Sequence, residues 1–369
     1  MSKGNGFLDL LHRLVNWFVR RRHPSRIILW AGAAIMAATL GAGWTFGVSG
    51  KGGALNIRGW FSTGSEVPPS MIWTAFAIAV ILLAVGATLV VGDWIANALR
   101  ARRTAVIVHE LRGLINTSDK PLLEAVPRRF NGQKLDGLVD VRTEMSSGGV
   151  QQAFDKISGV ADLVRRLRGA REARNVHLLV GGVLQVPFLF YVGVLLDDEG
   201  DLTAMDWDRQ GRRWRELDGM DDGGRFLPVD WSVISPGAAR VVLAISASYQ
   251  ADFGAIEATF SGIPVISLAL AHPLPDTLWS VAKQDALSAQ FLGVMAELGN
   301  RGVKEVELVL AASSSLSIRL GRAYDRRNLP RVACYQYQRD ASPPYPWCVE
   351  IEPSSARLSR TPVAASTRT

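Results

Sequence analysis

Residues 176–182 read VHLLVGG and residues 306–312 read VELVLAA, so two apolar stretches each end on two small residues. A short apolar helix is predicted after each of them, reaching Gly193 in the first copy and Gly321 in the second. The two strands are 130 positions apart along the chain, and the two glycines are 128 apart. An apolar strand followed by small residues and a helix is typical of a parallel α/β unit. The repeat therefore predicts two similar α/β halves in tandem, related by a pseudo-two-fold axis.

The chain beyond residue 103 follows the same alternation of apolar strands and amphipathic helices. Strands are predicted at Thr104–His109, Val176–Val180, Arg240–Ile245, Val265–Leu268 and Val306–Leu310, and helices over 150–168 and 285–299. This alternation indicates the α/β fold class, with two Rossmann-like halves at about 104–220 and 240–352 joined by a connector at 221–239. Residues 353–369 contain almost no aliphatic residues and are predicted to be a disordered tail.

The net charge of +7 is concentrated at the start of the chain. Residues 1–26 carry a charge of +5, whereas residues 104–369 carry −1. A surface that binds a polyanion needs clustered positive charge, which the composition of the larger C-terminal region does not favour. We therefore expect no DNA or RNA polymer as a partner. Hydrophobic residues make up 48% of the chain and charged residues 20%, which excludes a protein that is disordered throughout.

Two uncharged apolar stretches, 27–48 and 71–92, precede the α/β region. At a rise of ~1.5 Å per residue, each is long enough to cross a hydrocarbon core of ~30 Å as a helix. Arginines precede the first stretch at Arg20, Arg21, Arg22 and Arg26, and others follow the second at Arg100, Arg102 and Arg103. The positive-inside bias predicts a two-helix transmembrane hairpin over 27–103, with both termini in the cytoplasm and a short loop on the other side.

Residues 1–26 place apolar residues at helical spacing beside arginines, which predicts an amphipathic helix on the cytoplasmic leaflet or, alternatively, a helix packed on the soluble domain. Small residues such as the pair in Gly43-xxx-Gly47 favour contact between helices in lipid. The two apolar stretches contain no ionisable residue, which argues against a proton relay or a transporter site. Two helices cannot enclose a polar path by themselves, so any pore requires several chains.

The residues that follow the predicted strands are candidates for ligand binding. In open parallel sheets, ligands bind beyond the carboxyl ends of the strands, where helix N-termini present N–H groups to anions. The candidates at these positions are His109, Glu110, Arg112, Gly181, Gly182, Ser246, Ser248, Tyr249, Ser313 and Ser314. Two facing halves would form a composite pocket suited to a compact ring of phosphates. The alternative is that these small and polar residues serve only tight turns and helix caps.

The segment 206–216, DWDRQGRRWRE, interleaves arginines with tryptophans. Arg212 and Trp214 are candidates for pairing with a phosphate and stacking on a base. The alternative is an exposed charged hairpin whose tryptophans pack on the sheet.

No sequence motif indicates catalysis, a cofactor or a metal ion: GxGxxG, a phosphate-binding Walker loop, GxSxG and HExxH are absent from the sequence. His109 and Glu110 form the one candidate acid–base pair, so a membrane-tethered enzyme acting on nucleotides remains an alternative function. Cys334 and Cys348 are too far apart for a CxxC pair and are expected to be reduced thiols in a cytosolic domain.

Several segments together resemble the SAVED domain of bacterial CBASS anti-phage effectors. They are VHELRGL at 108–114, NVHLLVGGVLQVPFLFYVG at 175–193, RRWRE at 212–216, VVLAISASY at 241–249 and the long stretch from VELVLAASSS to WCVEI at 306–351. The resemblance covers about 104–352, and with two spans ahead of it the chain is similar to the two-transmembrane class of SAVED effector. It departs from the nuclease, protease and TIR classes because it has no catalytic effector domain.

The resemblance implies a SAVED domain made of two CARF-like halves that binds a cyclic oligonucleotide, a cyclic di- or trinucleotide. A partner nucleotidyltransferase of the CD-NTase type would make this ligand after phage infection. Binding would assemble the SAVED domains into a homo-oligomer, cluster the spans in the inner membrane of the bacterium, and kill the infected cell by breaching the lipid bilayer. A third hypothesis, a membrane scaffold that needs no ligand, predicts constitutive assembly.

Overall fold

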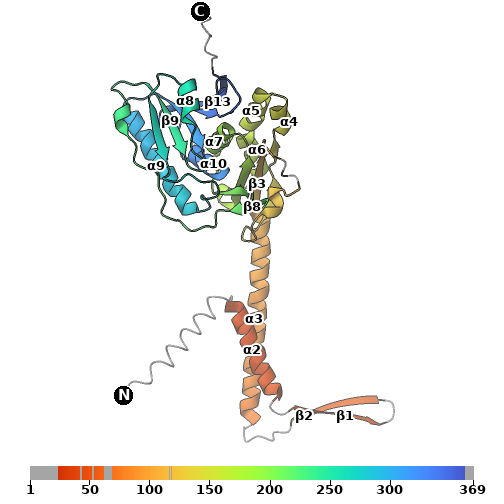
Figure 1. Ribbon diagram of the computed structural model, residues 1–369. Coiled ribbons are helices and arrows are strands. Elements are labelled where there is room, and N and C mark those ends of the chain that lie inside the picture. Colours follow the sequence, from red (N-terminus) through yellow and green to blue (C-terminus); the bar gives the residue numbers. More distant parts are fainter. Residues whose placement is uncertain are drawn as a thin grey trace, which may run out of the picture. The chain divides into compact units, whose positions relative to one another are not determined.

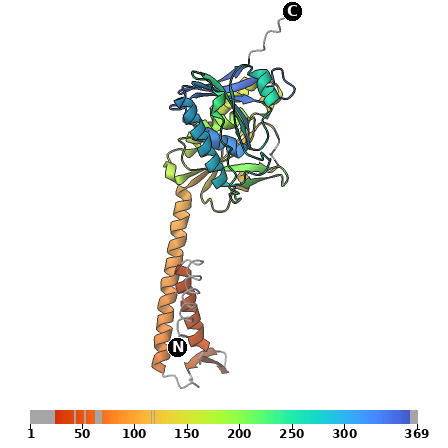
Figure 2. The ribbon, with the colours of Figure 1, turned by 60° about the vertical axis from the view of Figure 1, so that its left-hand side comes forward.

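The computed structural model describes residues 24–41, 44–51, 54–61, 69–115, 117 and 119–361. The chain divides into two compact units, Met1–Arg100 and Ala101–Thr369, whose elements are labelled in Figure 1 and seen from a second side in Figure 2. The amphipathic helix predicted within 1–26 lies almost wholly outside the described residues, as does the end of the predicted tail at 362–369.

The first unit contains two helices and a two-stranded sheet. Its helices are α2 (Pro24–Gly41) and α3 (Pro69–Arg103), and its strands are β1 (Trp44–Lys51) and β2 (Ala54–Phe61), paired antiparallel. Within the described residues, one helical stretch is long and apolar enough to cross a membrane, Ser70–Ala96 in α3, with a mean hydropathy of 2.6. It contains the predicted span 71–92. The apolar stretch of α2, Ile27–Thr39, is shorter.

The predicted span 27–48 is wrong in its second part. Helix α2 ends at Gly41, and residues 44–48 belong to strand β1. Glycine is a poor helix former, and the strand that follows contains the β-branched residues Thr45 and Val48 beside aromatic residues, which favour extended backbone. The loop expected between the spans therefore contains a β-hairpin.

Helices α2 and α3 approach closely at two glycines. A Cβ atom at Gly32 would lie 2.8 Å from the backbone nitrogen of Leu83, and one at Gly86 would lie 2.6 Å from that of Leu29. Larger residues at either position would force the helices apart, so small residues do mediate this contact. The predicted motif does not supply it, because Gly47 lies in strand β1.

Two six-stranded sheets form the second unit. The first has the order β4-β3-β6-β7-β8, with β5 paired to β3, and the second has the order β10-β9-β11-β12-β13-β14. The strands of the first sheet are β3 (Ala105–Arg112), β4 (Gln133–Asp136), β5 (Val139–Asp140), β6 (Val176–Val183), β7 (Leu202–Asp208) and β8 (Arg213–Glu216). The strands of the second are β9 (Arg240–Ser246), β10 (Val265–Ala269), β11 (Glu305–Ala311), β12 (Arg331–Gln336), β13 (Trp347–Ile351) and β14 (Ala356–Arg360).

The two sheets share one topology, which confirms the predicted duplication. In the first sheet, β3 lies between β4 and β6, and in the second, β9 lies between β10 and β11. All four pairings are parallel. The next strand of each sheet, β7 or β12, is also parallel to its neighbour, and the strand after it, β8 or β13, is antiparallel. The helices of this unit are α4 (Arg142–Ser146), α5 (Val150–Ser158), α6 (Val160–Arg168), α7 (Val186–Leu195), α8 (Phe253–Thr259), α9 (Val281–Asn300) and α10 (Ser314–Ala323), with 3₁₀ turns η1 (Leu122–Ala125), η2 (Ala173–Asn175) and η3 (Trp231–Val233).

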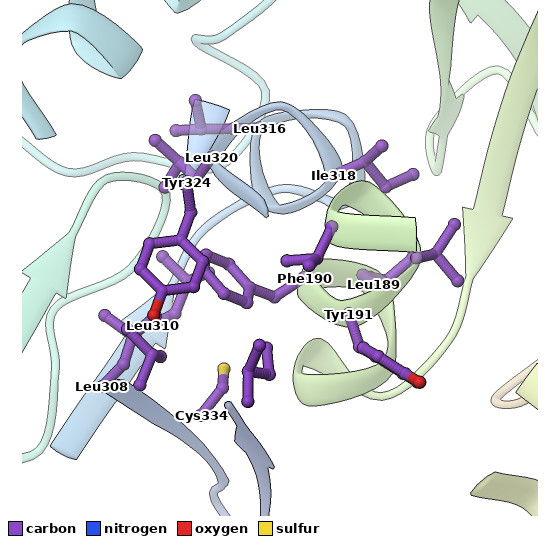
Figure 3. Packing of buried hydrophobic residues seen from close by; sticks show 14 of the residues in the cluster. Leu189, Phe190, Tyr191, Leu308, Leu310, Leu316, Ile318, Leu320, Tyr324 and Cys334 are labelled. Carbon is purple, nitrogen blue, oxygen red and sulfur yellow. The ribbon is translucent and has the colours of Figure 1, made fainter. Parts of the chain in front are cut away.

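Helices α7 and α10, which occupy equivalent places in the two halves, pack directly against each other in the core. A Cβ atom at Gly193 would lie 2.1 Å from the carbonyl oxygen of Ile318, and one at Gly321 would lie 1.9 Å from that of Phe190. Figure 3 shows the apolar residues gathered around this contact, where the rings of Phe190 and Tyr324 have centroids 5.9 Å apart. The two glycines of the sequence repeat therefore lie at the contact between the halves.

Several boundaries differ from those predicted. The first-half strands run about three residues further than expected, to Arg112 and Val183, because β5 pairs with the end of β3 and β6 pairs along its full length. The expected disordered tail contains strand β14, which pairs antiparallel with β13. Its alternating residues place Ala356 and Leu358 against the core.

Candidate functional site

A cavity of about 550 Å³ lies at the carboxyl ends of strands from both sheets of the second unit. Its lining comes from β6, β7, β11 and β12 and from the segments that follow these strands and β3, β9 and β10. The polar and aromatic residues of this lining include Asp206, Trp207, Arg209, Ser248, Tyr249, Asp252, Trp279, Ser313, Ser314, Tyr337 and Arg339. This is the edge of a parallel sheet where ligands are expected, and the volume lies within the range of ~300–1,000 Å³ typical of ligand pockets.

Four of the predicted site residues line this cavity: Ser248, Tyr249, Ser313 and Ser314. Ser248 is 2% exposed, and its hydroxyl has no hydrogen-bond partner among the described residues. Buried polar groups are normally paired, so this hydroxyl is available to a ligand. Tyr249 is 42% exposed, which leaves its ring accessible. Ser313 caps helix α10, and its hydroxyl accepts from the backbone nitrogen of Leu316 at 3.4 Å.

Asp206, at the end of β7, reaches across from the first half to the start of α10 in the second. Its Oδ2 accepts hydrogen bonds from the hydroxyl of Ser315 at 2.7 Å and from the backbone nitrogen of the same residue at 3.2 Å. Burial raises the pKa of the Asp206 carboxyl, while the bonds from Ser315 act in the opposite direction. The start of α10 thus already binds a carboxyl group beside the cavity, at the end of a helix whose free N–H groups favour such a partner.

Aromatic rings and guanidinium groups line the rest of the cavity. Arg209 donates to the hydroxyl of Tyr249 at 3.0 Å, and Tyr337 donates from its own hydroxyl to Asp252 at 2.9 Å. Arg339 supplies a second cationic group. Aromatic faces can stack on bases, and guanidinium groups pair with phosphates. This combination suits a nucleotide ligand that carries both.

Asp206, Trp207 and Arg209 were not among the predicted site residues, although all three lie in the segment 206–216 that was predicted to contact the ligand. The signal that would have found them is the turn of the β7–β8 hairpin. Asp206 and Trp207 lie in strand β7, which runs to the cavity edge, and Arg209 is the first residue after it. Arg212 is the last residue of the turn, next to β8, with a φ of 45°.

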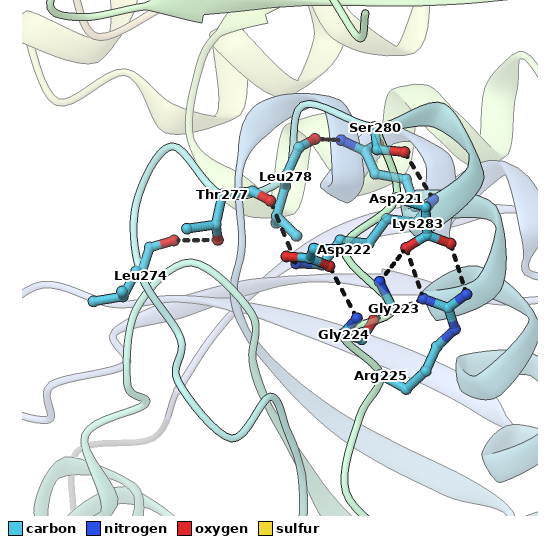
Figure 4. A network of polar contacts seen from close by, with 11 residues as sticks. Asp221, Asp222, Gly223, Gly224, Arg225, Leu274, Thr277, Leu278, Ser280 and Lys283 are labelled. Carbon is cyan, nitrogen blue, oxygen red and sulfur yellow. Dashed lines mark hydrogen bonds and ion pairs between the residues drawn. The ribbon is translucent and has the colours of Figure 1, made fainter. Parts of the chain in front are cut away.

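The loop that carries Trp279 to the cavity is held by a polar network drawn in Figure 4. The buried ammonium group of Lys283 binds the carboxylate of Asp222 at 2.8 Å and the carbonyl oxygen of Thr277 at 3.4 Å. Nearby, Asp221 binds Arg225 at 2.7 Å, and this bond lowers the pKa of the Asp221 carboxyl to about 2. The connector between the halves is therefore tied to the start of α9 and to one wall of the cavity.

Glu110 and Arg112 lie within strand β3, outside the cavity lining. The Oε1 atom of Glu110 accepts from the Nε of Arg112 at 2.7 Å and from the hydroxyl of Thr117 at 2.6 Å. Its Oε2 accepts from the backbone nitrogen of Leu122 at 2.8 Å. The carboxylate thus anchors the segment that follows β3, which is a structural role.

The two glycines of β6 and Trp214 also lie outside the lining, and they pack together or against the core. A Cβ atom at Gly181 would lie 2.9 Å from the ring of Trp214, and one at Gly182 would lie 2.9 Å from Leu111. The indole nitrogen of Trp214 donates to the carbonyl oxygen of Lys120 at 3.1 Å. These positions match the alternative in which the small residues and the tryptophan serve packing.

Ser246 and Arg212 complete the predicted set, and neither lines the cavity. The hydroxyl of Ser246 accepts from the backbone nitrogen of Ala251 at 3.0 Å, which shapes the turn after β9 beside Ser248 and Tyr249. Arg212 is exposed in the β7–β8 turn. Ser246 thus holds the turn that carries Ser248 and Tyr249 to the cavity, whereas Arg212 makes no part of the cavity lining.

His109 is fully buried in β3, and burial lowers its pKa to about 4. Above pH ~6.5 the ring is neutral in both the folded and unfolded chain. As the pH falls from ~6.5 toward 4, the unfolded chain takes up a proton that the folded ring does not. We therefore expect the free energy of unfolding to fall by about 2 kcal/mol between pH 7.5 and pH 5, measured by denaturant titration of the full chain.

The leucine variant H109L is the control, because it keeps an apolar residue of similar size and cannot take up the proton. Its free energy of unfolding should show less loss over the same pH interval. An equal loss in both proteins would contradict a neutral buried imidazole at this position.

Family models match two stretches of the chain. The SAVED domain, described as the SMODS-associated and fused to various effectors sensor domain, matches residues 160–351. Saf_2TM, described as the SAVED-fused 2TM effector domain, matches residues 5–155. A search of the curated proteins found no match.

Similar solved structures include receptors that contain SAVED/CARF domains. The Acinetobacter baumannii Cap4 receptor with the cyclic trinucleotide 2'3'3'-cAAA is 12% identical, with a TM-score of 0.43 over 77% of this chain and 58% of that one. The same receptor with 3'3'3'-cAAA is 11% identical, with a TM-score of 0.42 over 77% and 59%. The Moraxella osloensis Cap4 receptor is 12% identical, with a TM-score of 0.38 over 65% and 48%. The chain thus spans 58% of the length of the first structure.

Proposed function

The chain belongs to the SAVED family, with a SAVED-fused 2TM effector domain ahead of its sensor domain, and from this we propose that it is a membrane-anchored CBASS effector. Its ligand is a cyclic di- or trinucleotide supplied by a CD-NTase-type nucleotidyltransferase. Ligand binding drives the sensor domains to assemble, and assembly clusters the helices of the effector domain in the inner membrane. The clustered helices breach the bilayer and kill the infected cell.

The observation that carries the proposal is the cavity at the joint edge of both sheets. A ring-shaped ligand with several phosphates and bases needs contacts from more than one direction. The second half contributes Ser248, Tyr249 and the start of α10, and the first half contributes Trp207 and Arg209. Stacking on an aromatic ring contributes ~1–3 kcal/mol per base, so the rings favour bases as part of the ligand.

The proposed output depends on the effector domain. Helix α3 contains the apolar stretch Ser70–Ala96, and the arginines at 100, 102 and 103 follow it, which favours a cytoplasmic sensor domain by the positive-inside bias. Two helices from one chain enclose no polar path, so damage to the bilayer requires several chains. A ligand favours the assembled state only by binding it better than the free protein.

The test uses the full chain reconstituted into vesicles that hold a self-quenched dye. A panel of cyclic di- and trinucleotides is added, and dye release is followed together with the size of the detergent-solubilised protein by light scattering. We expect at least one compound to cause both dye release and a shift to higher oligomers. If no member of the panel caused dye release or a change in size, the proposal would be overturned.

The same experiment separates the two alternatives. Dye release without any compound would favour the ligand-independent scaffold. Conversion of a cyclic compound into linear products, lost in the variant H109A, would favour the membrane-tethered enzyme. The placement of His109 and Glu110, both buried and outside the cavity lining, gives no support to the enzyme.

A further inference from the structure

Gln336 is the last residue of strand β12, and it lines the cavity. Strand β12 is parallel to β11, so its carboxyl end lies at the same edge of the sheet as the serines that follow β11. On its other side Gln336 is paired with Trp347 of β13. The sheet therefore holds the backbone of Gln336 in place at the cavity.

One end of the Gln336 amide has a partner within the protein, and the other end has none. The Nε2 atom donates to the backbone carbonyl oxygen of Tyr337 at 2.8 Å. The Oε1 atom is buried and has no hydrogen-bond partner among the described residues. Buried polar atoms are normally paired, because an unpaired atom loses its bonds to water without replacement. The Oε1 atom therefore needs a donor from outside the described part of the chain.

The bond to Tyr337 also determines which end of the amide is which. If the two ends were exchanged, the amide oxygen would face the carbonyl oxygen of Tyr337, and two acceptors would meet with no proton between them. The nitrogen must therefore lie toward that carbonyl group. Gln336 offers a ligand an acceptor, so the ligand group that binds it has to carry an N–H or O–H.

The surroundings of Gln336 favour a base as the source of this donor. Tyr337 follows it directly, lines the same cavity and is 36% exposed. The ring of Tyr337 is held by the bond from its hydroxyl to Asp252 and by the ring of Tyr345, 5.4 Å away. Such a ring suits stacking on a base, and amide side chains bind the exocyclic amino groups of bases. A phosphodiester carries only acceptors and cannot pair with the Oε1 atom.

Trp347 is the competitor for this atom within the protein. It is opposed to Gln336 in the sheet, and its indole nitrogen is also buried without a partner among the described residues. The indole packs in the core, with its ring centroid 5.1 Å from that of Phe188. A bond between Gln336 and Trp347 is the alternative, and it predicts that Gln336 has no effect on which base is bound.

We propose that Gln336 determines base specificity in the cavity, because its Oε1 atom accepts a hydrogen bond from the exocyclic amino group of adenine or cytosine. Hypoxanthine and uracil carry a carbonyl oxygen in place of that amino group, so two acceptors would face each other and binding would weaken. The ligand is then a cyclic oligonucleotide that contains adenine or cytosine. This inference rests on the proposed function, because it requires a nucleotide in this cavity.

The test measures affinities of the detergent-solubilised full chain by isothermal calorimetry, for pairs of rings that differ in this one group. Cyclic di- and tri-AMP are compared with their inosine counterparts, and the cytidine rings with the uridine rings. Q336M removes the amide and keeps an unbranched side chain of similar length. Q250M is the matched control, because it makes the same change at an exposed residue of the same cavity lining.

We expect the wild type and Q250M to prefer the amino-bearing member of at least one pair by about tenfold to a hundredfold, and Q336M to reduce this preference to within about threefold. The wild-type comparison needs no variant, so it stands even if Q336M unfolds. Equal wild-type affinities within every pair would overturn the inference and leave the proposed function standing, with a ribose hydroxyl or Trp347 as the donor. A preference unchanged in Q336M would also overturn it. Binding of no ring at all would overturn both.

Discussion

Replacing Gly321 by alanine is expected to destabilise the sensor domain by about 3 kcal/mol or more. A Cβ atom there would lie 1.9 Å from the carbonyl oxygen of Phe190, and the equivalent change at Gly193 would bring it 2.1 Å from that of Ile318. Both contacts are with backbone atoms of the facing helix, which cannot rotate away as a side chain can. Helices α7 and α10 must then separate, and the apolar core between the halves opens. Denaturant unfolding of the full chain, followed by tryptophan fluorescence, measures the loss.

Gly293 offers a matched control on helix α9. It is exposed, and no atom lies within 4 Å of a Cβ built there. G293A should be neutral or should stabilise the protein by up to about 1 kcal/mol, because alanine is the better helix former. If G321A and G293A had the same free energy of unfolding, the close contact between α7 and α10 at Gly321 would be contradicted.

Replacing Arg209 by alanine is expected to weaken binding of the cognate cyclic nucleotide about 10- to 100-fold. The guanidinium group lies in the cavity lining, where it already bonds to Tyr249. A hydrogen bond between charged partners contributes ~1.5–3 kcal/mol, and ~1.4 kcal/mol corresponds to a factor of ten in affinity. Isothermal calorimetry on the detergent-solubilised full chain measures the change.

Arg212 is the matched control, three residues further along the same hairpin. R212A removes the same charge from an exposed turn that does not line the cavity. Its affinity for the ligand should stay within about twofold of the wild type, since only long-range, screened electrostatics would change. Equal losses in R209A and R212A would place the phosphate at the turn and not in the cavity.

The core strands of the second unit were predictable because most of their residues are buried. Strands β3, β6, β9, β10 and β11 each begin within one residue of the predicted start, since runs of valine, leucine and isoleucine admit few other structures. The helix expected over 150–168 is divided at Gly159 into α5 and α6. The ends of the first-half strands were missed because a pairing partner, β5, comes from a distant segment with a weak local signal.

The candidate site was predictable in the second half and less so in the first. Ser248, Tyr249, Ser313 and Ser314 follow strands whose ends were predicted to within one residue, and all four line the cavity. In the first half the strands continue past Glu110 and Gly181. The cavity edge is therefore formed by later residues, among them Val183 and Leu184.

The sequence by itself determined the duplicated α/β halves, the apolar helix α3 and the edge of the sheets where the cavity lies. Each of these follows from residue periodicity and burial, which are local properties of the chain. Only the tertiary structure decided that Asp206 of one half binds the start of α10 in the other, and that Arg209 faces the cavity while Arg212 does not. Asp206 and Ser315 are 109 positions apart and Arg209 and Tyr249 are 40 apart, so no local pattern of residues predicts these contacts. Their geometry depends on the close packing of α7 against α10, which fixes one half relative to the other.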